Sequence, residues 1–158
     1  MRRFLVVATV VALSLVASGV ALAQNDAHIG TWKLNVAKSK FASGLTYKSE
    51  TRTYEPTADG YRFTGESVSG DGSTHNSSFS VKYDNKDYPY TGDRYGADTL
   101  AVKLIDANHI DSTLKKSGKL LYTAKVVVSK DGKVMTITAK GTDADGHAFS
   151  DMRVFDKQ

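Results

Sequence analysis

Short runs in which apolar and polar residues alternate fill the chain from residue 31 onward. In the first run Trp32 and Leu34 fall on one face and Lys33 on the other. Alternation with a period of two predicts a β-strand with one buried face and one face toward solvent. The longest apolar face is predicted for residues 119–129, where it comprises Leu120, Tyr122, Ala124, Val126 and Val128. No stretch of this part has the period of an amphipathic helix, so the pattern predicts an all-β fold.

Turn-forming residues separate these runs at short intervals. Asp-Gly and similar pairs supply the positive φ that tight β-hairpins need. They include Asp59-Gly60, Asp71-Gly72, Asp131-Gly132 and Asp145-Gly146. The sequence therefore predicts ten strands, at residues 31–36, 47–55, 61–68, 74–83, 87–91, 99–105, 109–115, 119–129, 133–140 and 147–156. Residues 37–46 lack alternation, and we expect an irregular crossing or one short helical turn there.

A long meander of hairpins favours an antiparallel up-and-down β-barrel of about 8–10 strands. Closing the sheet removes the exposed edge strands that invite aggregation. A barrel of this size leaves room for side chains and one small ligand. The alternative is a two-sheet β-sandwich, but sandwiches usually need longer crossing connections than these turns provide.

The first 23 residues have the pattern of a secretory signal peptide. Arg2 and Arg3 form a basic start, residues 4–20 are almost wholly apolar, and Ala21-Leu22-Ala23 matches a small-residue cleavage site. The alternative is an uncleaved membrane anchor, although the apolar run is barely long enough to span a bilayer. We expect an exported protein, in the periplasm or outside the cell. Its single domain comprises residues 24–158 and is not expected to insert stably into a membrane.

Composition narrows the class of protein. The chain has no Cys, so disulfides and thiolate-bound metals are excluded, and packing and strand pairing must hold the domain together. The net charge is +4, of which Arg2 and Arg3 supply two, which leaves about +2 after cleavage. Lys and Asp are scattered through the turns, which is typical of a solvated surface and argues against nucleic-acid binding.

Two segments at opposite ends of the domain carry a family resemblance. They are Gly30-Thr31-Trp32-Lys33-Leu34 and Met152-Arg153-Val154-Phe155-Asp156-Lys157. They resemble the first and last strands of the calycin superfamily, which contains lipocalins and fatty-acid-binding proteins. The whole domain also resembles small exported bacterial lipocalin-like proteins of undefined function. In such barrels a first-strand Trp packs under a last-strand Arg, so the resemblance implies a structural latch between Trp32 and Arg153.

Two departures from the fatty-acid-binding branch limit what the resemblance implies. That branch has two helices after the first strand, and residues 37–46 are too short for a helical pair, so its lid is expected to be missing. That branch also binds carboxylates with an Arg-x-Tyr of the last strand, where this chain has Arg153 and Phe155. Arg153 therefore has two roles open to it: a clamp on Trp32, which we favour, or a contact to the acid group of a ligand.

The sequence lacks the motifs of common enzymes, and we expect no enzyme. It has no G-x-S-x-G, no Cys nucleophile and no His near an acid in a recognisable motif. His28, His75, His109 and His147 fall in different predicted elements, and we expect them at strand ends on the surface, with no metal or other cofactor. Asp143-Ala144-Asp145-Gly146 resembles part of a calcium loop but lacks the distal Glu, so we expect a hairpin turn.

The leading hypothesis is a binding protein whose barrel holds a small, largely apolar molecule. Alternation places apolar side chains on the inner wall, and the predicted ligand-binding residues are Phe63, Phe79, Tyr122, Val126, Arg153 and Phe155. Thr136 and Thr138 are also expected to face inward, which makes the predicted cavity partly wet. The Tyr-rich segment 88–96 is expected to cover one end of the barrel, with a ligand or partner contact as the alternative.

Two other functions stay open. The first is a structural or interaction protein of the cell envelope, with a barrel filled by side chains and no ligand. The second is a calycin-type protease inhibitor, which needs an extended N-terminal arm where only Gln24 to Ile29 precede the first predicted strand. An occupied interior cavity discriminates the binding protein from the filled barrel.

Overall fold

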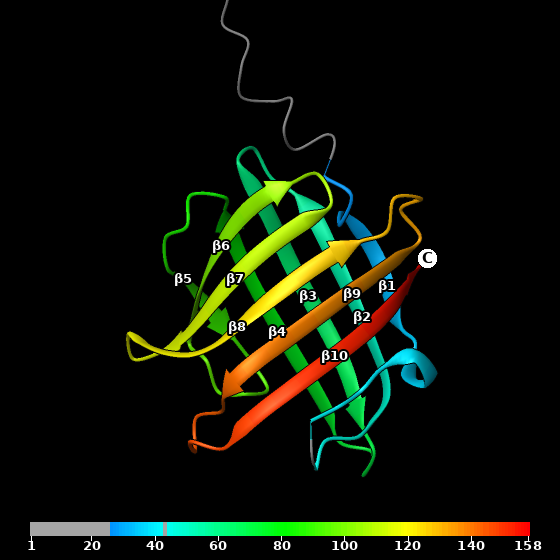
Figure 1. Ribbon diagram of the computed structural model, residues 1–158, viewed down its shortest axis with the longest axis vertical. Helices are drawn as coiled ribbons and strands as arrows, with labels where there is room; N and C mark the ends of the chain where they lie inside the picture. The colour runs from blue at the N-terminus through cyan, green and yellow to red at the C-terminus, as the bar shows by residue number, and fades with distance from the viewer. Residues whose placement is uncertain (1–25, 43) are drawn as a thin grey trace, which may run out of the picture.

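The computed structural model describes residues 26–42 and 44–158, which form one closed β-barrel (Figure 1). Its elements are β1 (Gly30–Leu34), the 3-10 turn η2 (Val36–Lys38), β2 (Tyr47–Pro56), β3 (Gly60–Ser69), β4 (Thr74–Lys82), β5 (Tyr88–Thr91), β6 (Thr99–Asp106), β7 (His109–Lys116), β8 (Lys119–Val128), β9 (Val134–Thr142) and β10 (Ala148–Lys157). Strands that are consecutive in sequence pair antiparallel, and β1 pairs with β10 to close the barrel. The predicted all-β barrel is confirmed, and the sandwich alternative is wrong.

Each of the ten predicted strands is present and begins and ends within two residues of its predicted bounds. The turns explain this agreement, because Gly72, Gly132 and Gly146 adopt φ values of 93°, 70° and 86° that L-residues avoid. Residues 37–46 contain the end of η2 and an isolated bridge from Lys40 to Met152, as the missing alternation predicted. No helical pair lies between β1 and β2 in the described part of this segment.

The inward faces of the strands supply an apolar core. Trp32, Phe63, Met135 and Phe155 are fully buried, and the Phe63 ring stacks on Phe79 with centroids 4.7 Å apart. Burying one large apolar side chain stabilises the fold by roughly 1.5–3 kcal/mol, so these side chains carry much of the stability of a chain without disulfides. The core therefore replaces the covalent links that the composition excludes.

One end of the barrel, which we call the closed end, is sealed by Trp32 and the segment before β1. Nε1 of Trp32 donates a hydrogen bond of 2.7 Å to the carbonyl of His28. The His28 ring pairs with the Asp26 carboxylate, which also accepts a hydrogen bond from the Tyr83 hydroxyl. The same imidazole packs edge-on against the Tyr61 ring. His28 is 2% exposed, so the expectation that every His lies on the surface is wrong for this residue.

The cation over Trp32 is Lys157 rather than Arg153. Strand pairing sets Lys157 opposite Trp32, with Nζ 5.0 Å from the centroid of the indole. Arg153 lies four residues earlier on β10, roughly 13 Å along the strand, which is too far for stacking. Its guanidinium contacts Glu50 inside the barrel instead. The predicted Trp32–Arg153 latch is therefore wrong, and Lys157 occupies the position that the prediction gave to Arg153.

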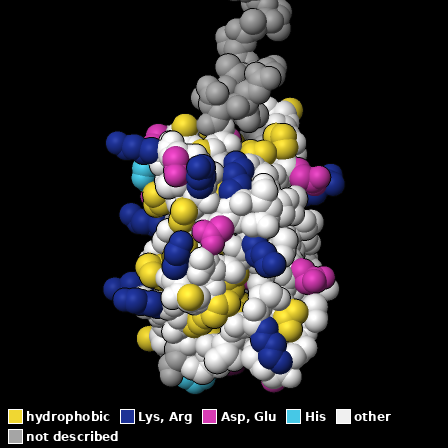
Figure 2. Space-filling model, turned by 90° about the vertical axis from the view of Figure 1, so that its right-hand side faces the viewer, with side chains coloured by type: hydrophobic (Ala, Val, Ile, Leu, Met, Phe, Trp, Pro, Cys, Tyr) yellow, Lys and Arg dark blue, Asp and Glu magenta, His cyan; other side chains and the backbone are white. Residues whose placement is uncertain are grey.

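The outer surface carries mixed charges. Figure 2 shows Lys and Arg spread over one face of the molecule, with acidic and apolar side chains between them. Within residues 26–42 and 44–158, no helix has the length and apolar character needed to cross a membrane. The predicted signal peptide, residues 1–23, lies outside the described residues.

Candidate functional site

The barrel encloses an interior cavity of about 80 Å³. Inward side chains of β2 to β10 and of the loop after β5 build its wall. An engineered apolar cavity of roughly 150 Å³ binds benzene, so this space suits something smaller, such as a few waters or a molecule of a few heavy atoms. Most of the barrel interior is filled by side chains.

A charged network forms one side of this cavity. Glu50 lies at its centre and accepts hydrogen bonds from Nε of Arg52 at 2.6 Å and from Nη1 of Arg153 at 3.2 Å. Glu50 is 4% exposed and each arginine 9%. Arg52 also donates to the Tyr54 hydroxyl at 2.9 Å, and its guanidinium lies 4.8 Å from the Phe63 centroid. The shared carboxylate stabilises two cations that burial alone would disfavour.

The network continues from Arg153 to Asp151. Nε of Arg153 lies 3.2 Å from Oδ2 of Asp151, which is 1% exposed and accepts a 2.5 Å hydrogen bond from the Tyr95 hydroxyl. Burial raises the pKa of Tyr95, so its hydroxyl stays protonated and can donate. Two guanidiniums thus face two carboxylates, and the network is compensated in charge.

The period-two geometry of strands explains why these charges point inward. Residues two apart share one face, so Glu50, Arg52 and Tyr54 of β2 are buried while the Thr residues between them face outward. Asp151 and Arg153 alternate in the same way on β10. The sequence contains this signal, but charged residues usually lie at the surface, so Glu50, Arg52 and Asp151 were not predicted as inward residues.

Two opposing effects set the pKa of Glu50. Burial acts to raise it, because the charged form loses hydration. The attraction of Arg52 and Arg153, with their hydrogen bonds, outweighs burial and leaves the pKa of Glu50 lowered. Glu50 is therefore ionised at neutral pH and provides the negative charge that both arginines need.

A second polar group lines the cavity beside this network. The Arg94 guanidinium lies 4.5 Å from the centroid of the Tyr47 ring, and its Nη2 donates to Oγ of Ser69 at 2.9 Å. Nε and Nη1 of Arg94 and the hydroxyl of Tyr47 are buried and have no hydrogen-bond partner among the described residues. The sequence alone does not predict either residue as part of the site: Tyr47 begins a strand, and nothing in the Tyr-rich turn singles out its one arginine.

Asp93 and Tyr122 form a third polar contact at the cavity wall. The Tyr122 hydroxyl donates to Oδ1 of Asp93 at 2.6 Å, and the backbone N–H of Ala97 donates to Oδ2 at 2.8 Å. Burial raises the pKa of Asp93 against these hydrogen bonds. Both oxygens of Asp93 are thus used within the fold.

The six predicted ligand-binding residues divide into two groups. Phe79, Tyr122, Val126 and Arg153 line the cavity. Phe63 and Phe155 are fully buried and lie behind the wall, where the Arg52 guanidinium covers their rings. The contribution of any of them to ligand binding stays a prediction.

The expectation for Thr136 and Thr138 is wrong. Met135, Ile137 and Ala139 are the buried residues of β9, so the two threonines between them face outward. Charged and tyrosyl side chains, rather than these threonines, give the cavity its polar character.

The Tyr-rich segment lies partly inside the barrel. Tyr90 lines the cavity, and Tyr95 is buried with its ring stacked on Phe149 at 3.7 Å between centroids.

The β9–β10 turn brings Asp143, Asp145 and His147 together, and Asp143 accepts backbone hydrogen bonds from the other two. These bonds form the predicted hairpin turn.

The closed ten-strand antiparallel meander defines an up-and-down β-barrel with a polar cavity in its interior. Two solved structures resemble it over most of its length. One is EF1p2_mFAP2b bound to DFHBI, with 11% identity over 89% of this chain and 100% of that chain, at a TM-score of 0.45. The other is zebrafish ileal bile acid-binding protein complexed with cholic acid, with 13% identity over 84% of this chain and 99% of that chain, at 0.44. No family model and no curated protein matches the sequence.

Proposed function

We propose that this protein binds a small molecule in the interior cavity. The observation that carries the proposal is the set of buried donors on Tyr47 and Arg94 that have no partner within the described fold and line the cavity. A buried polar group without a hydrogen bond costs about 1–3 kcal/mol, more when it is charged. A bound molecule that accepts these hydrogen bonds recovers that cost.

The wall favours a compact ligand with both apolar and polar parts. Phe79, Tyr90 and Val126 offer apolar and aromatic contact, while Arg94 and Tyr47 fix orientation. The cavity volume of about 80 Å³ disfavours long chains and fused rings. The ligand that we propose is therefore smaller and more polar than the largely apolar molecule predicted from the sequence.

Native mass spectrometry of protein purified from its own host tests this proposal. We expect a bound mass that is released on denaturation and recovered by organic extraction. A bare protein mass, with nothing extracted and no change in the Tyr spectra on titration with short aliphatic acids or amides, would contradict it.

A second candidate function is a filled barrel that binds nothing. The small cavity volume favours it, because a few waters could satisfy the same donors. In that case the protein has a structural or interaction role, and the mass experiment yields the bare chain. We favour binding, because the unpartnered donors of Tyr47 and Arg94 lie on the same cavity wall as the apolar side chains of Phe79 and Val126.

Export remains a proposal that rests on residues 1–23 alone. We expect the protein isolated from its host to begin at Gln24 and to occur in the periplasmic or extracellular fraction. N-terminal sequencing checks this, and an intact Met1 on the isolated protein would contradict it.

A further inference from the structure

Three guanidiniums line the interior cavity, and Arg94 differs from the other two. Arg52 and Arg153 each pair with Glu50. For Arg94, the described residues provide no carboxylate within ion-pair distance. Its contacts are the Tyr47 ring and the Ser69 hydroxyl, neither of which carries charge. Arg94 is therefore a cation at a cavity wall without a counter-ion.

The neighbouring acid does not supply that counter-ion. Asp93 uses both carboxylate oxygens to accept from the Tyr122 hydroxyl and from the Ala97 backbone. The Asp93 carboxylate is thus directed at Tyr122 and Ala97 and makes no ion pair with Arg94. Among the described residues Arg94 thus has no ion-pair partner, and a bound anion would supply one.

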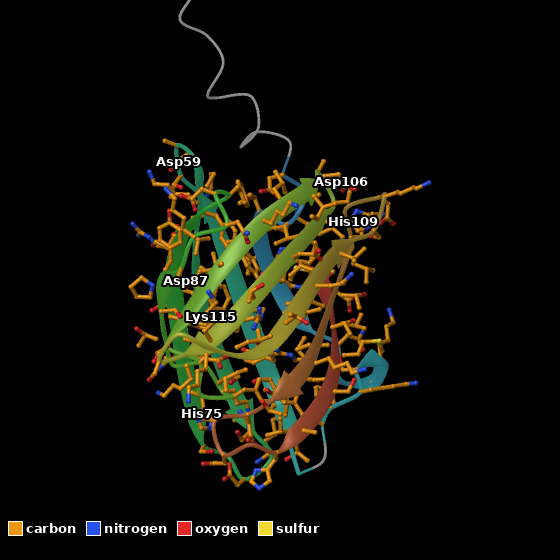
Figure 3. All side chains as sticks on the ribbon, turned by 60° about the vertical axis from the view of Figure 1, so that its left-hand side comes forward. Asp59, His75, Asp87, Asp106, His109 and Lys115 are labelled. Carbon is orange, nitrogen blue, oxygen red and sulfur yellow. The ribbon has the colours of Figure 1, made fainter. Side chains whose placement is uncertain are left out.

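Arg94 also lies where the cavity approaches an outer cleft. His75, Gly92, Asp93 and Arg94 line both the cavity and an open cleft of about 550 Å³. β4 pairs with β5 only at Ser78 and the residue after it, so the first residues of β4 are not paired with β5 beside this cleft. Figure 3 shows His75 at the end of the barrel opposite Asp59 and Asp106. The cleft therefore marks the way into the interior, away from the closed end.

We propose that Arg94 and Tyr47 form a subsite for the carboxylate of a small organic acid that enters through this cleft. Burial raises the pKa of Tyr47, so its hydroxyl keeps a proton to donate. Nε and Nη1 of Arg94 supply the other donors. Hydrogen bonds between charged partners are about twice as strong as neutral ones. The inference rests on the proposed function, since it names the ligand class of the same cavity.

The volume sets the size of this acid. A space of about 80 Å³ is smaller than the roughly 150 Å³ of a cavity that binds benzene, so it favours a short carbon chain on the carboxylate. Arg153 is not the anion contact, because Glu50 and Asp151 already neutralise the network to which it belongs. The carboxylate of the ligand therefore binds at Arg94, beside the outer cleft, and its carbon chain points toward Phe79 and Tyr90.

The test compares propionate with propionamide, which has nearly the same shape but no charge. Binding to the full mature chain is followed by ¹H–¹⁵N chemical-shift titration at neutral pH and low salt. We expect propionate to bind at least about tenfold more tightly, a difference of about 1.4 kcal/mol. The largest shifts are expected at residues 47 and 92–96.

Arg94→Gln removes the charge and should abolish the preference for propionate, whereas the matched control Arg62→Gln, at an exposed position on β3, should keep it. Arg94→Lys retains a cation and should retain part of the preference, which keeps the test valid if Arg94→Gln does not fold. Tyr47→Phe should weaken propionate binding several-fold.

Equal binding of propionate and propionamide, or an unchanged preference in Arg94→Gln, would overturn the anion subsite while leaving the binding function intact. If neither compound binds and the host-purified protein carries no extractable molecule, the proposed function fails first. The two failures are thus distinguishable.

Discussion

Charged side chains are buried in the interior of this barrel, although most small domains keep such residues at the surface. The Glu50 carboxylate accepts hydrogen bonds from both Arg52 and Arg153, and all three residues are at least nine-tenths buried. A buried ion pair rarely adds net stability compared with apolar residues, but removing one member leaves the others uncompensated. The network is therefore expected to be sensitive to single substitutions.

Glu50→Gln should destabilise the protein strongly. The substitution leaves two buried guanidiniums without their shared carboxylate, and breaking a buried pair in this way costs about 3–5 kcal/mol. Urea denaturation measures the loss of free energy of unfolding. Glu66→Gln, on the exposed face of β3, is the control and should stay within about 0.5 kcal/mol of wild type. Equal effects of the two substitutions would contradict the role given to Glu50.

The same residue predicts a pH dependence. Because the pKa of Glu50 is lowered in the folded state, its stabilisation is present above its ordinary value of 4.5 and is lost as pH falls through the folded value. The gap in unfolding free energy between wild type and Glu50→Gln should therefore narrow below about pH 4.5. The raised pKa of Asp93 acts in the opposite direction, so the comparison of variants isolates Glu50. A gap that stays constant from pH 7 to pH 3 would argue against this assignment.

Trp32→Ala should destabilise the closed end by roughly 3–5 kcal/mol, the usual cost of emptying a buried aromatic site. Lys157→Ala removes only an exposed cation–π contact and should cost about 0.5–1 kcal/mol. Denaturation with guanidinium chloride compares the two variants. A Trp32→Ala protein that unfolds at the wild-type midpoint would show that the indole does not anchor the barrel.

At the scale of elements, the sequence predicts the strands well because turns and alternation agree. Asp-Gly pairs mark hairpin ends, and Gly72, Gly132 and Gly146 adopt the positive φ that such turns require. Orientation is less predictable where both faces tolerate the same residue. Thr136 and Thr138 suit either face of a strand, and only the burial of Met135 and Ile137 shows which face is inward.

The candidate site was less predictable than the strands. Alternation could find Phe79, Tyr122 and Val126, because apolar residues at every second position indicate an inner face. It could not assign Arg94, whose position depends on a loop between two short pairings. The Lys157 contact to Trp32 depends on the register of β1 and β10, which neither strand specifies by itself.

The loop after β5 packs closely against β4, and this packing requires a glycine at position 92, next to the backbone of Asn76. A Cβ at Gly92 would lie 2.0 Å from the carbonyl oxygen of Asn76, and the residue has φ +74°. Gly118 has φ +78° with open space around it, so it is a matched control. Gly118→Ala should cost about 1–2 kcal/mol from its backbone conformation, and Gly92→Ala clearly more. Equal losses in urea denaturation would show that the contact with Asn76 relaxes freely.

At the scale of the whole molecule, the barrel has no open edge among the described strands, because β1 and β10 pair. Closure protects backbone groups that would otherwise pair with another molecule. Residues 32 to 34 of β1 lie opposite residues 157 to 155 of β10. The integrity of the barrel therefore depends on the last few residues of the chain.

Deleting residues 156–158 should open this seam. β1 then loses the partners of Trp32 and Lys33, and we expect lower stability and concentration-dependent self-association. Light scattering coupled to size-exclusion chromatography measures the association. The double substitution Asp156→Ala and Lys157→Ala keeps the backbone pairing and should stay monomeric if wild type is. Association of this control to the same extent would implicate the side chains instead of the exposed edge.

The seam between β1 and β10 also governs how quickly the protein can form. Every other pair of strands joins neighbours in sequence, so those hairpins can form early, whereas this pair brings the two ends of the barrel sequence together. Contacts between distant residues slow folding, because the entropy of closing the intervening loop must be lost first. The meander is therefore expected to form before the cylinder closes. Until then the newly made chain exposes two edges at once, which is the interval when a chaperone has most to protect.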